Sequence, residues 1–213
     1  MSTRPTWPED AEQLVALQRD LAGIEPEQPR WRPAGSKGLL VGAVYAAPVR
    51  GHHGLGAAGD PAWAAAAVLH HHDVVAHAVV RGHFRAPYRP GLLALREGAL
   101  LEQTVRSAGI TPDVLLVNAS GTDHPRGAGL ALHLGWAVGV PTIGITDRVL
   151  HNPAASVPVT LREGARPVLV HPGWRTDMKV ALDVVGGLGG SRTPVPLRVA
   201  RQLARSARAG DAR

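Results

Sequence analysis

Short apolar segments separated by polar turns run through the chain, and their lengths are typical of β-strands. The first five lie at residues 39–46, 63–70, 74–80, 114–117 and 140–145. Apolar runs of about four to eight residues that are bounded by turn residues predict buried strands. We therefore expect a central five-stranded sheet, followed along the chain by a late hairpin at residues 157–161 and 167–170.

Apolar residues spaced three or four apart predict helices around these strands. The helices are expected at residues 7–21, 92–108, 125–138, 177–185 and 194–209. Strands come first as a group and then alternate with helices, which favours an α/β fold with a mixed sheet and helices on both faces. We expect one domain over 1–213, with an N-terminal helix and connector at 1–33 and a basic C-terminal helix or tail at 194–213.

The segment 114–129 combines a strand, a polar loop and the predicted start of a helix. Four apolar residues end at Val117, the loop 118–123 follows, and Pro125 suits the first turn of a helix. Ligands of open α/β sheets bind outside the carboxyl ends of strands, and a helix N-terminus attracts anions such as phosphate. A binding site is therefore predicted at this loop.

The charge balance is basic, with 23 Lys and Arg residues against 17 Asp and Glu residues and a formal net charge of +6. Such a balance suits a polyanionic partner. A bias toward arginine in the whole composition explains it equally well, because only Lys37 and Lys179 are lysines. Four arginines of the last helix fall on one predicted face, where a solvated surface is expected: Arg198, Arg201, Arg205 and Arg208.

Composition also excludes several kinds of chemistry. The chain has no cysteine, which rules out disulfides, zinc–thiolate sites and thiol catalysis. The N-terminus lacks a secretory apolar region, and no apolar run is long enough to span a bilayer. A cytoplasmic protein that does not bind membranes is the expectation.

Two patterns that suggest chemistry are better explained without it. Residues 54–59 match the dinucleotide pattern GxGxxG, but Pro61 follows where a helix should run, so a hairpin loop is predicted. The histidines at 52–53 and 70–72 suggest a metal site, but adjacent side chains on a strand point to opposite faces. Solvent exposure is expected for these histidines.

Three segments, in the same order and spacing, resemble the endonuclease V family, whose RNase H-like members nick DNA or RNA near inosine. The sequence PYRPGLLALRE at 87–97 resembles the family segment PYxPGxLxxRE. The sequence GTDHPRGAG at 121–129 resembles GxxHPRxxG, and VPTIGI at 140–145 resembles VPTIGV. The resemblance implies an RNase H-like fold, DNA repair and recognition of deoxyinosine or inosine in DNA or RNA by a monomer.

The resemblance also implies roles for individual residues. Pro87 and Pro90 stiffen a loop around Tyr88, and a rigid loop with an aromatic tip can act as a wedge in a base stack. Small glycines let backbone approach a flat base closely, so that amides could read its edge. The positions that match the family's hypoxanthine pocket are Gly91, Leu93, Gly121, His124 and Gly129, and Arg126 and Arg89 are expected to contact phosphate.

The catalytic residues implied by the family are mostly absent. Family members bind Mg²⁺ through carboxylates, and the Mg²⁺ ion activates water and stabilises the leaving oxygen. Only Glu97 is kept, as the expected catalytic residue and weak metal ligand. The two Asp positions hold Val44 and Asn118, the Lys position falls near Asp147, and the His position holds Trp174. Because Asn118 offers only a neutral carbonyl, we expect Mg²⁺ binding to be weak or absent.

Three functions remain open at this point. The first is a protein that binds inosine-containing or unstacked nucleic acid and cleaves it poorly or not at all. The second is an active deoxyinosine endonuclease whose metal centre is rebuilt from substitutes, for which the candidates are Asp123, Asp147, Asp177 and His171. The third is a pocket reassigned to a small purine-like metabolite.

Overall fold

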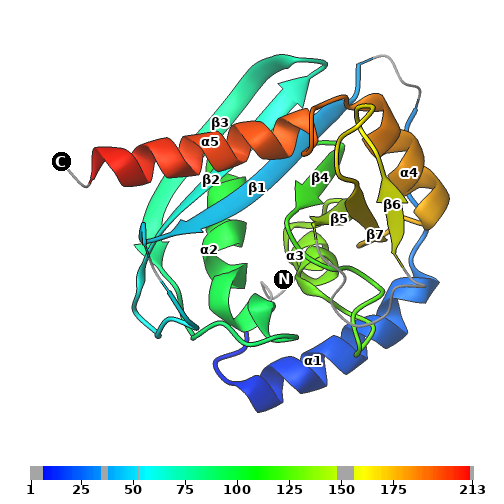
Figure 1. Ribbon diagram of the computed structural model, residues 1–213. Helices are drawn as coiled ribbons and strands as arrows, with labels where there is room; N and C mark the ends of the chain where they lie inside the picture. The colour runs from blue at the N-terminus through cyan, green and yellow to red at the C-terminus, as the bar shows by residue number, and fades with distance from the viewer. Residues whose placement is uncertain (1–6, 35–37, 52, 148–155, 212–213) are drawn as a thin grey trace.

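The computed structural model describes residues 7–34, 38–51, 53–147 and 156–211, and Figure 1 shows their arrangement. One seven-stranded sheet crosses the molecule in the order β3-β2-β1-β4-β5-β7-β6. Its strands are β1 (Leu40–Pro48), β2 (Pro61–His70), β3 (Asp73–His83), β4 (Val114–Val117), β5 (Thr142–Thr146), β6 (Val157–Val159) and β7 (Val168–Pro172). The helices are α1 (Ala11–Ile24), the 3-10 helix η1 (Glu25–Glu27), α2 (Leu93–Ser107), α3 (Leu130–Val138), α4 (Met178–Gly187) and α5 (Val195–Gly210).

The sheet is mixed, as the order of elements predicts. Strands β1, β4 and β5 are parallel, whereas β2, β3, β6 and β7 pair antiparallel to their neighbours. The expected number of five strands is wrong, because the late hairpin joins the same sheet. Strand β7 pairs with β5 from Ile143↔Pro172 to Thr146↔Leu169 and carries β6 at the outer edge.

Helices cover both faces of the sheet, which confirms the predicted layering (Figure 1). Alternate side chains of β1 point to the two opposite faces of the sheet. Val44 and Ala46 pack in the cluster formed with α2 and α3, whereas Val41 and Ala43 pack in the cluster formed with α4 and α5. This alternation is the normal consequence of strand geometry.

Strand β4 is much shorter than its neighbour β1, and this leaves a notch in the sheet. The parallel pairing of the two strands ends at Val44↔Val117, but β1 continues through Tyr45 to Pro48. That last part of β1 is paired with β2 on one side only. The carboxyl ends of β4 and β5 therefore open toward β1, which is where ligands of α/β sheets bind.

Several predicted helix boundaries are wrong. The helix expected at 7–21 is α1, Ala11–Ile24, and the start of α3 and the end of α4 also differ. Helix α3 begins at Leu130, so Pro125 lies in the preceding loop rather than in the first turn. Gly127 has φ +74° and its N–H donates to the His124 carbonyl at 2.7 Å, which closes a tight turn before the helix. Helix α4 in turn continues through Gly186 and Gly187, which were expected to stop it.

The N-terminal segment is fixed to α2 and α3 by Trp7. The indole nitrogen of Trp7 donates to Glu102 Oε2 at 2.6 Å, and the ring stacks on His133 with centroids 4.1 Å apart. Burial lowers the pKa of His133 to about 3, so its imidazole is neutral in the interior. Among the described residues, no helix is both long and apolar enough to cross a bilayer.

A pair of glycine substitutions tests this packing. In α2, a Cβ on Gly98 would lie 2.1 Å from the Trp7 ring, whereas in α4 a Cβ on Gly186 would meet nothing within 4 Å. We expect Gly98→Ala to lower the free energy of unfolding by about 1–3 kcal/mol through overpacking. The control Gly186→Ala should raise it by about 0.5–1 kcal/mol, because alanine loses less backbone entropy. Urea unfolding measures both, and equal stabilisation by the two would contradict the Trp7 contact.

Candidate functional site

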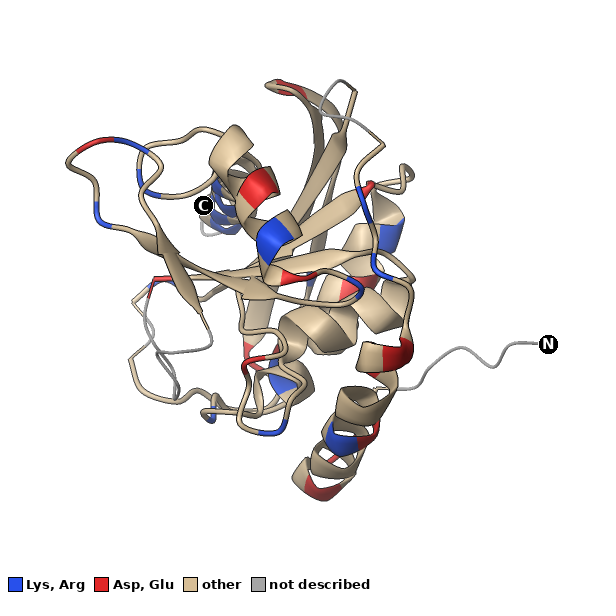
Figure 2. Cartoon of the chain, turned by 90° about the vertical axis from the view of Figure 1, so that its right-hand side faces the viewer, with Lys and Arg blue, Asp and Glu red and all other residues tan. Residues whose placement is uncertain are grey.

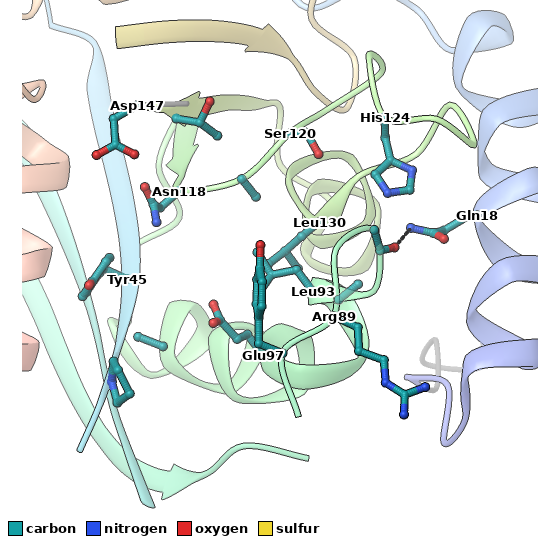
Figure 3. Close-up of a pocket in the computed structure, with 17 residues that line it drawn as sticks. Gln18, Tyr45, Arg89, Leu93, Glu97, Asn118, Ser120, His124, Leu130 and Asp147 are labelled. Carbon is teal, nitrogen blue, oxygen red and sulfur yellow. Dashed lines mark hydrogen bonds between the residues drawn. The ribbon is translucent and has the colours of Figure 1, made fainter. Parts of the chain in front are cut away.

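A cavity of about 310 Å³ occupies the notch between β1 and the ends of β4 and β5. Its walls come from six parts of the chain, as Figure 3 shows for the labelled side chains. Two of these parts are the sequence segments singled out above, around Tyr88 and around His124. Several residues that the sequence analysis expects to contact the ligand or a metal line this cavity, namely Tyr88, Arg89, Gly91, Leu93, Glu97, Asn118 and His124.

The loop that carries Tyr88 is held rigidly. The guanidinium of Arg96 lies 3.8 Å over the Phe84 ring and donates to the Ala86 carbonyl at 2.7 Å. The N–H of Tyr88 donates to the Leu55 carbonyl at 2.6 Å. The Tyr88 side chain is nevertheless 38% exposed. A fixed backbone with an exposed ring at the cavity is the arrangement that a wedge requires.

Gln18 of α1 belongs to the site, although the sequence analysis did not select it. Its side chain lines the cavity and donates to the Ala128 carbonyl at 2.8 Å. Gln18 falls at helical spacing between Leu14 and Leu21 and is buried with them. A polar residue on the apolar face of an amphipathic helix was the signal that could have identified it.

Arg126 has a structural role in this site, and its expected contact with phosphate stays a prediction. Its Nε donates to Gln18 Oε1 at 2.7 Å, and its Nη2 donates to the Gly91 carbonyl at 2.5 Å. These bonds tie α1, the Tyr88 loop and the His124 loop together. Arg89, in contrast, lines the cavity at its exposed edge (Figure 3).

Gly121 and Gly129 support the site without lining the cavity. A Cβ on Gly121 would lie 1.8 Å from the Pro172 carbonyl oxygen, and one on Gly129 would lie 2.3 Å from that of Ser120. The N–H of Gly121 donates to Asp123 Oδ1 at 3.0 Å, and that of Gly129 donates to the Gly121 carbonyl at 2.8 Å. Both amides donate within the protein in this structure, and the reading of a base edge by these glycines stays a prediction. These glycines allow backbone segments to cross.

His124 reaches the cavity beside Gly91. The Nδ1 atom of His124 accepts a hydrogen bond from the Arg126 N–H at 3.2 Å. A neutral imidazole whose Nδ1 accepts carries its proton on Nε2. Gly91 has φ +78°, and a Cβ there would lie 3.4 Å from His124 Nε2, so glycine keeps this side of the histidine uncovered.

Three polar side chains from different elements surround the opposite part of the cavity: Glu97 of α2, Asn118 after β4 and Asp147 after β5 (Figure 3). Burial raises the pKa of Glu97 to about 7, and the neighbouring Arg96 offsets this only in part. Asp147 Oδ2 lies 3.7 Å from Arg192 Nη2. At neutral pH the site thus combines a partly protonated carboxyl, a neutral amide and a carboxylate next to an arginine.

The expected substitutes for the lost metal ligands are largely engaged elsewhere. Asp123 Oδ2 lies 2.6 Å from His171 Nδ1, and Thr146 Oγ1 lies 2.8 Å from His171 Nε2, so both imidazole nitrogens are bonded. Burial alone would raise the pKa of Asp123, but the hydrogen bond and charge of His171 lower it overall. Asp177 caps α4 through the Val180 N–H.

Two positions of a family-type catalytic centre, Val44 and Trp174, lie outside the cavity. Val44 is buried in the core opposite Val117, and Ala46, two residues further along β1, lines the cavity instead. Trp174 is buried in a cluster with Leu21. The described residues contain no group of three or more His, Asp or Glu side chains that could hold a metal ion. The acidic residues that line the cavity are Glu97 and Asp147, with the Asn118 amide beside them, so a cation there would have two carboxyl groups where the family supplies three carboxylates.

Comparisons with known proteins agree with the class of protein that this fold and cavity define. A sequence profile described as Endonuclease V matches residues 55–160. The Endonuclease V of Roseiflexus castenholzii is 34% identical over 175 residues, which cover 72% of this chain and 79% of that protein. The chain belongs to the endonuclease V family.

Solved structures show the same fold. The crystal structure of Endonuclease V from Streptomyces avermitilis has a TM-score of 0.79 and 29% identity, covering 97% of this chain and 96% of that one. Ciona intestinalis Endonuclease V, in complex with a 24mer DNA that contains an inosine, has a TM-score of 0.76 and 19% identity. That alignment covers 94% of this chain and 100% of the other. The mixed α/β fold expected from the sequence is therefore confirmed.

The raised pKa of Glu97 predicts how stability depends on pH. A carboxyl whose folded pKa exceeds its unfolded value of 4.5 contributes most below pH 4.5 and loses that contribution as pH rises through 7. Glu97→Gln removes the cost of ionisation. We expect it to raise the free energy of unfolding by about 1–3 kcal/mol at pH 8 and to change little at pH 4.5. Urea unfolding at both pH values measures the difference.

The exposed Glu163 supplies the matched control. Glu163→Gln makes the same chemical change on the surface and should alter stability by less than about 0.5 kcal/mol at either pH. If Glu97→Gln changes the free energy of unfolding equally at pH 4.5 and pH 8, then ionisation of Glu97 does not destabilise the folded protein, and the raised pKa is contradicted.

Proposed function

We propose that this endonuclease V family member binds nucleic acid containing inosine or unstacked bases, and that its metal-dependent cleavage is impaired or lost. One observation carries the proposal. The cavity keeps the family-like Tyr88, Gly91, Leu93 and His124 along its walls, while Glu97 is the only acidic residue left at the family's three carboxylate positions.

The size and lining of the cavity support recognition of a base. A volume of about 310 Å³ lies at the small end of the range of ligand pockets. Leu93 and Leu130 provide apolar walls, while His124 and Ser120 provide polar groups near them (Figure 3). Apolar faces with a few fixed polar groups are what a flipped base needs. The DNA with an inosine in the Ciona intestinalis complex supports this choice of ligand.

The electrostatics of the site support impaired cleavage. A family-type centre would present three carboxylates to Mg²⁺, but Val44 and Asn118 replace two of them. Ion affinity follows the charge and number of ligands, so these changes remove most of the attraction. The raised pKa of Glu97 weakens it further, because a protonated carboxyl is a poor ligand for a cation.

Binding experiments test the base pocket directly. We expect single-stranded oligonucleotides with one inosine to bind about tenfold more tightly than matched adenine strands, with or without Mg²⁺. Tyr88→Ala should weaken both by roughly five- to 150-fold, since stacking on an aromatic side chain contributes about 1–3 kcal/mol per base. Tyr88→Phe keeps the ring and should bind like the unmodified protein. Fluorescence anisotropy measures all of these affinities, and equal weak binding of both strands would refute the proposal.

An active nuclease is the alternative, and one observation favours it. Asp147 lines the same cavity as Glu97 and could supply a second carboxylate. A nicking assay on inosine strands with Mg²⁺ or Mn²⁺ separates the two functions. If the purified protein cuts, and both Glu97→Gln and Asp147→Asn stop it, the cleavage centre has been rebuilt and the proposal of impaired cleavage is wrong.

A pocket for a small purine-like metabolite is the other function left open by the sequence. Its enclosed volume would suit a free nucleoside as well as a flipped nucleotide. Thermal-shift measurements with nucleosides and with DNA oligomers distinguish them. Stabilisation by a nucleoside without stabilisation by any oligomer would favour the metabolite.

A further inference from the structure

A second, smaller recess adjoins the base cavity on the side of the sheet covered by α5. Its volume is about 80 Å³. Three residues line both hollows, namely Asn118, Thr146 and Asp147. Two more walls come from the segment before α5 and from α5 itself, which contribute Arg192 and Arg201. The two hollows therefore meet at the open ends of β4 and β5.

Arg201 is held in position toward this recess. Its helix packs on the sheet through Leu197, Ala200 and Ala204, which are fully buried. The Arg201 guanidinium carbon lies 5.2 Å from the centre of the Tyr45 ring, close enough for a cation–π contact. The Nε atom of Arg201 is buried and has no hydrogen-bond partner among the described residues. A buried donor without a partner is costly, which makes it a candidate for a ligand contact.

The four arginines of α5 do not share one environment, which corrects the expectation of a uniformly solvated face. Arg198 and Arg205 are exposed. Arg201 faces Tyr45, and Arg208 donates to the Pro48 carbonyl at 2.9 Å. Figure 2 shows Lys and Arg residues on several separate elements. The net charge of the chain therefore does not identify the functional cation, whereas the packing of Arg201 does.

The charges around the recess favour an anion. Arg192 and Arg201 bring two positive charges, and Asp147 brings one negative charge at 3.7 Å from Arg192. The net charge is positive, and the Arg192 and Asp147 side chains, 53% and 60% exposed, lie at the open side of the recess. A planar guanidinium matches the oxygens of phosphate in geometry as well as in charge. Thr193 adds a hydroxyl to the same wall.

We propose that this recess binds a phosphate group of the nucleotide whose base occupies the adjoining cavity. The proposal rests on the proposed base-binding function and adds the contact that fixes the backbone of the ligand. Arg201 is the main ligand, and Arg192 is the second. Asp147 opposes the phosphate, so it limits the affinity of the subsite.

Inosine and inosine 5′-monophosphate are the probes that isolate the phosphate. They share a base and differ by one phosphate group. We expect the monophosphate to bind at least tenfold more tightly than the nucleoside by isothermal titration calorimetry. Arg201→Gln should reduce the ratio of the two affinities, monophosphate over nucleoside, to about two or less. It should leave the affinity for inosine itself unchanged.

Arg205→Gln is the matched control, because it removes the same charge from the exposed face of the same helix. It should keep the tenfold ratio. Arg192→Gln provides a second test at a side chain that is 53% exposed, so loss of folding is not a concern there. It should lower the ratio severalfold. Asp147→Asn removes the opposing charge, and it should raise the ratio rather than lower it.

Oligonucleotides distinguish a strand phosphate from a free nucleotide as the ligand. If the recess holds a phosphate of a bound strand, Arg201→Gln weakens inosine and adenine strands by the same factor. It also lowers the slope of log affinity against log salt by about one, and Arg205→Gln does so less. If only the monophosphate responds to Arg201→Gln, the subsite serves free nucleotides.

The outcomes separate this proposal from the proposed function. The phosphate subsite alone would be overturned if the protein binds inosine strands and inosine, but none of the three substitutions changes the affinity ratio of the monophosphate to inosine. The three substitutions are Arg201→Gln, Arg192→Gln and Asp147→Asn. Equal weak binding of inosine and adenine strands, with no binding of inosine, would overturn the base-binding function itself.

Discussion

The early end of strand β4 is the constraint on which the site depends. After Val117 the chain leaves the sheet and crosses the ends of two neighbouring strands at very short range. A Cβ on Gly144 of β5 would lie 2.2 Å from the Ala119 carbonyl oxygen, and one on Gly121 would lie 1.8 Å from that of Pro172 on β7. Only glycine permits such crossings without a shift of backbone. They place the His124 loop over the sheet and leave the notch beside β1 open.

The same geometry explains how the charged groups around the site are paired with other groups of the protein. Buried polar groups must be paired, and here the pairing is mostly internal. Asp123 and His171 bond to each other, Arg126 bonds to Gln18, and burial raises the pKa of Glu97 to about 7. In a family-type centre, Mg²⁺ would compensate neighbouring carboxylates. In this chain Val44 and Asn118 stand at two of those carboxylate positions, and Arg192 and Arg201 line the adjoining recess.

Sequence patterns predicted the fold class well because apolar periodicity reports which faces are buried. The strand at 114–117 and the helix near 92–108 agree closely with β4 and α2. The sequence could not show that the late hairpin extends the sheet, since β5–β7 pairing is a long-range contact. Nor could it show that Pro125 precedes α3, because that depends on the left-handed turn at Gly127. Local signals determine element type better than they determine partners or ends.

For the site, the motifs located the loops but not the function of every residue in them. Tyr88, Gly91, Leu93, Glu97 and His124 do line one cavity, whereas Gly121, Gly129 and Arg126 hold its walls together. A motif records which residue types are required, and a crossing of two backbones can require glycine as strictly as a ligand does. Arg201 shows the converse. It belongs to no motif, and it is distinguished from Arg205 only by where the packing of α5 directs it, toward Tyr45 and the end of β5. The lining of the notch is therefore set by the orientation of side chains as much as by the segments that resemble the family.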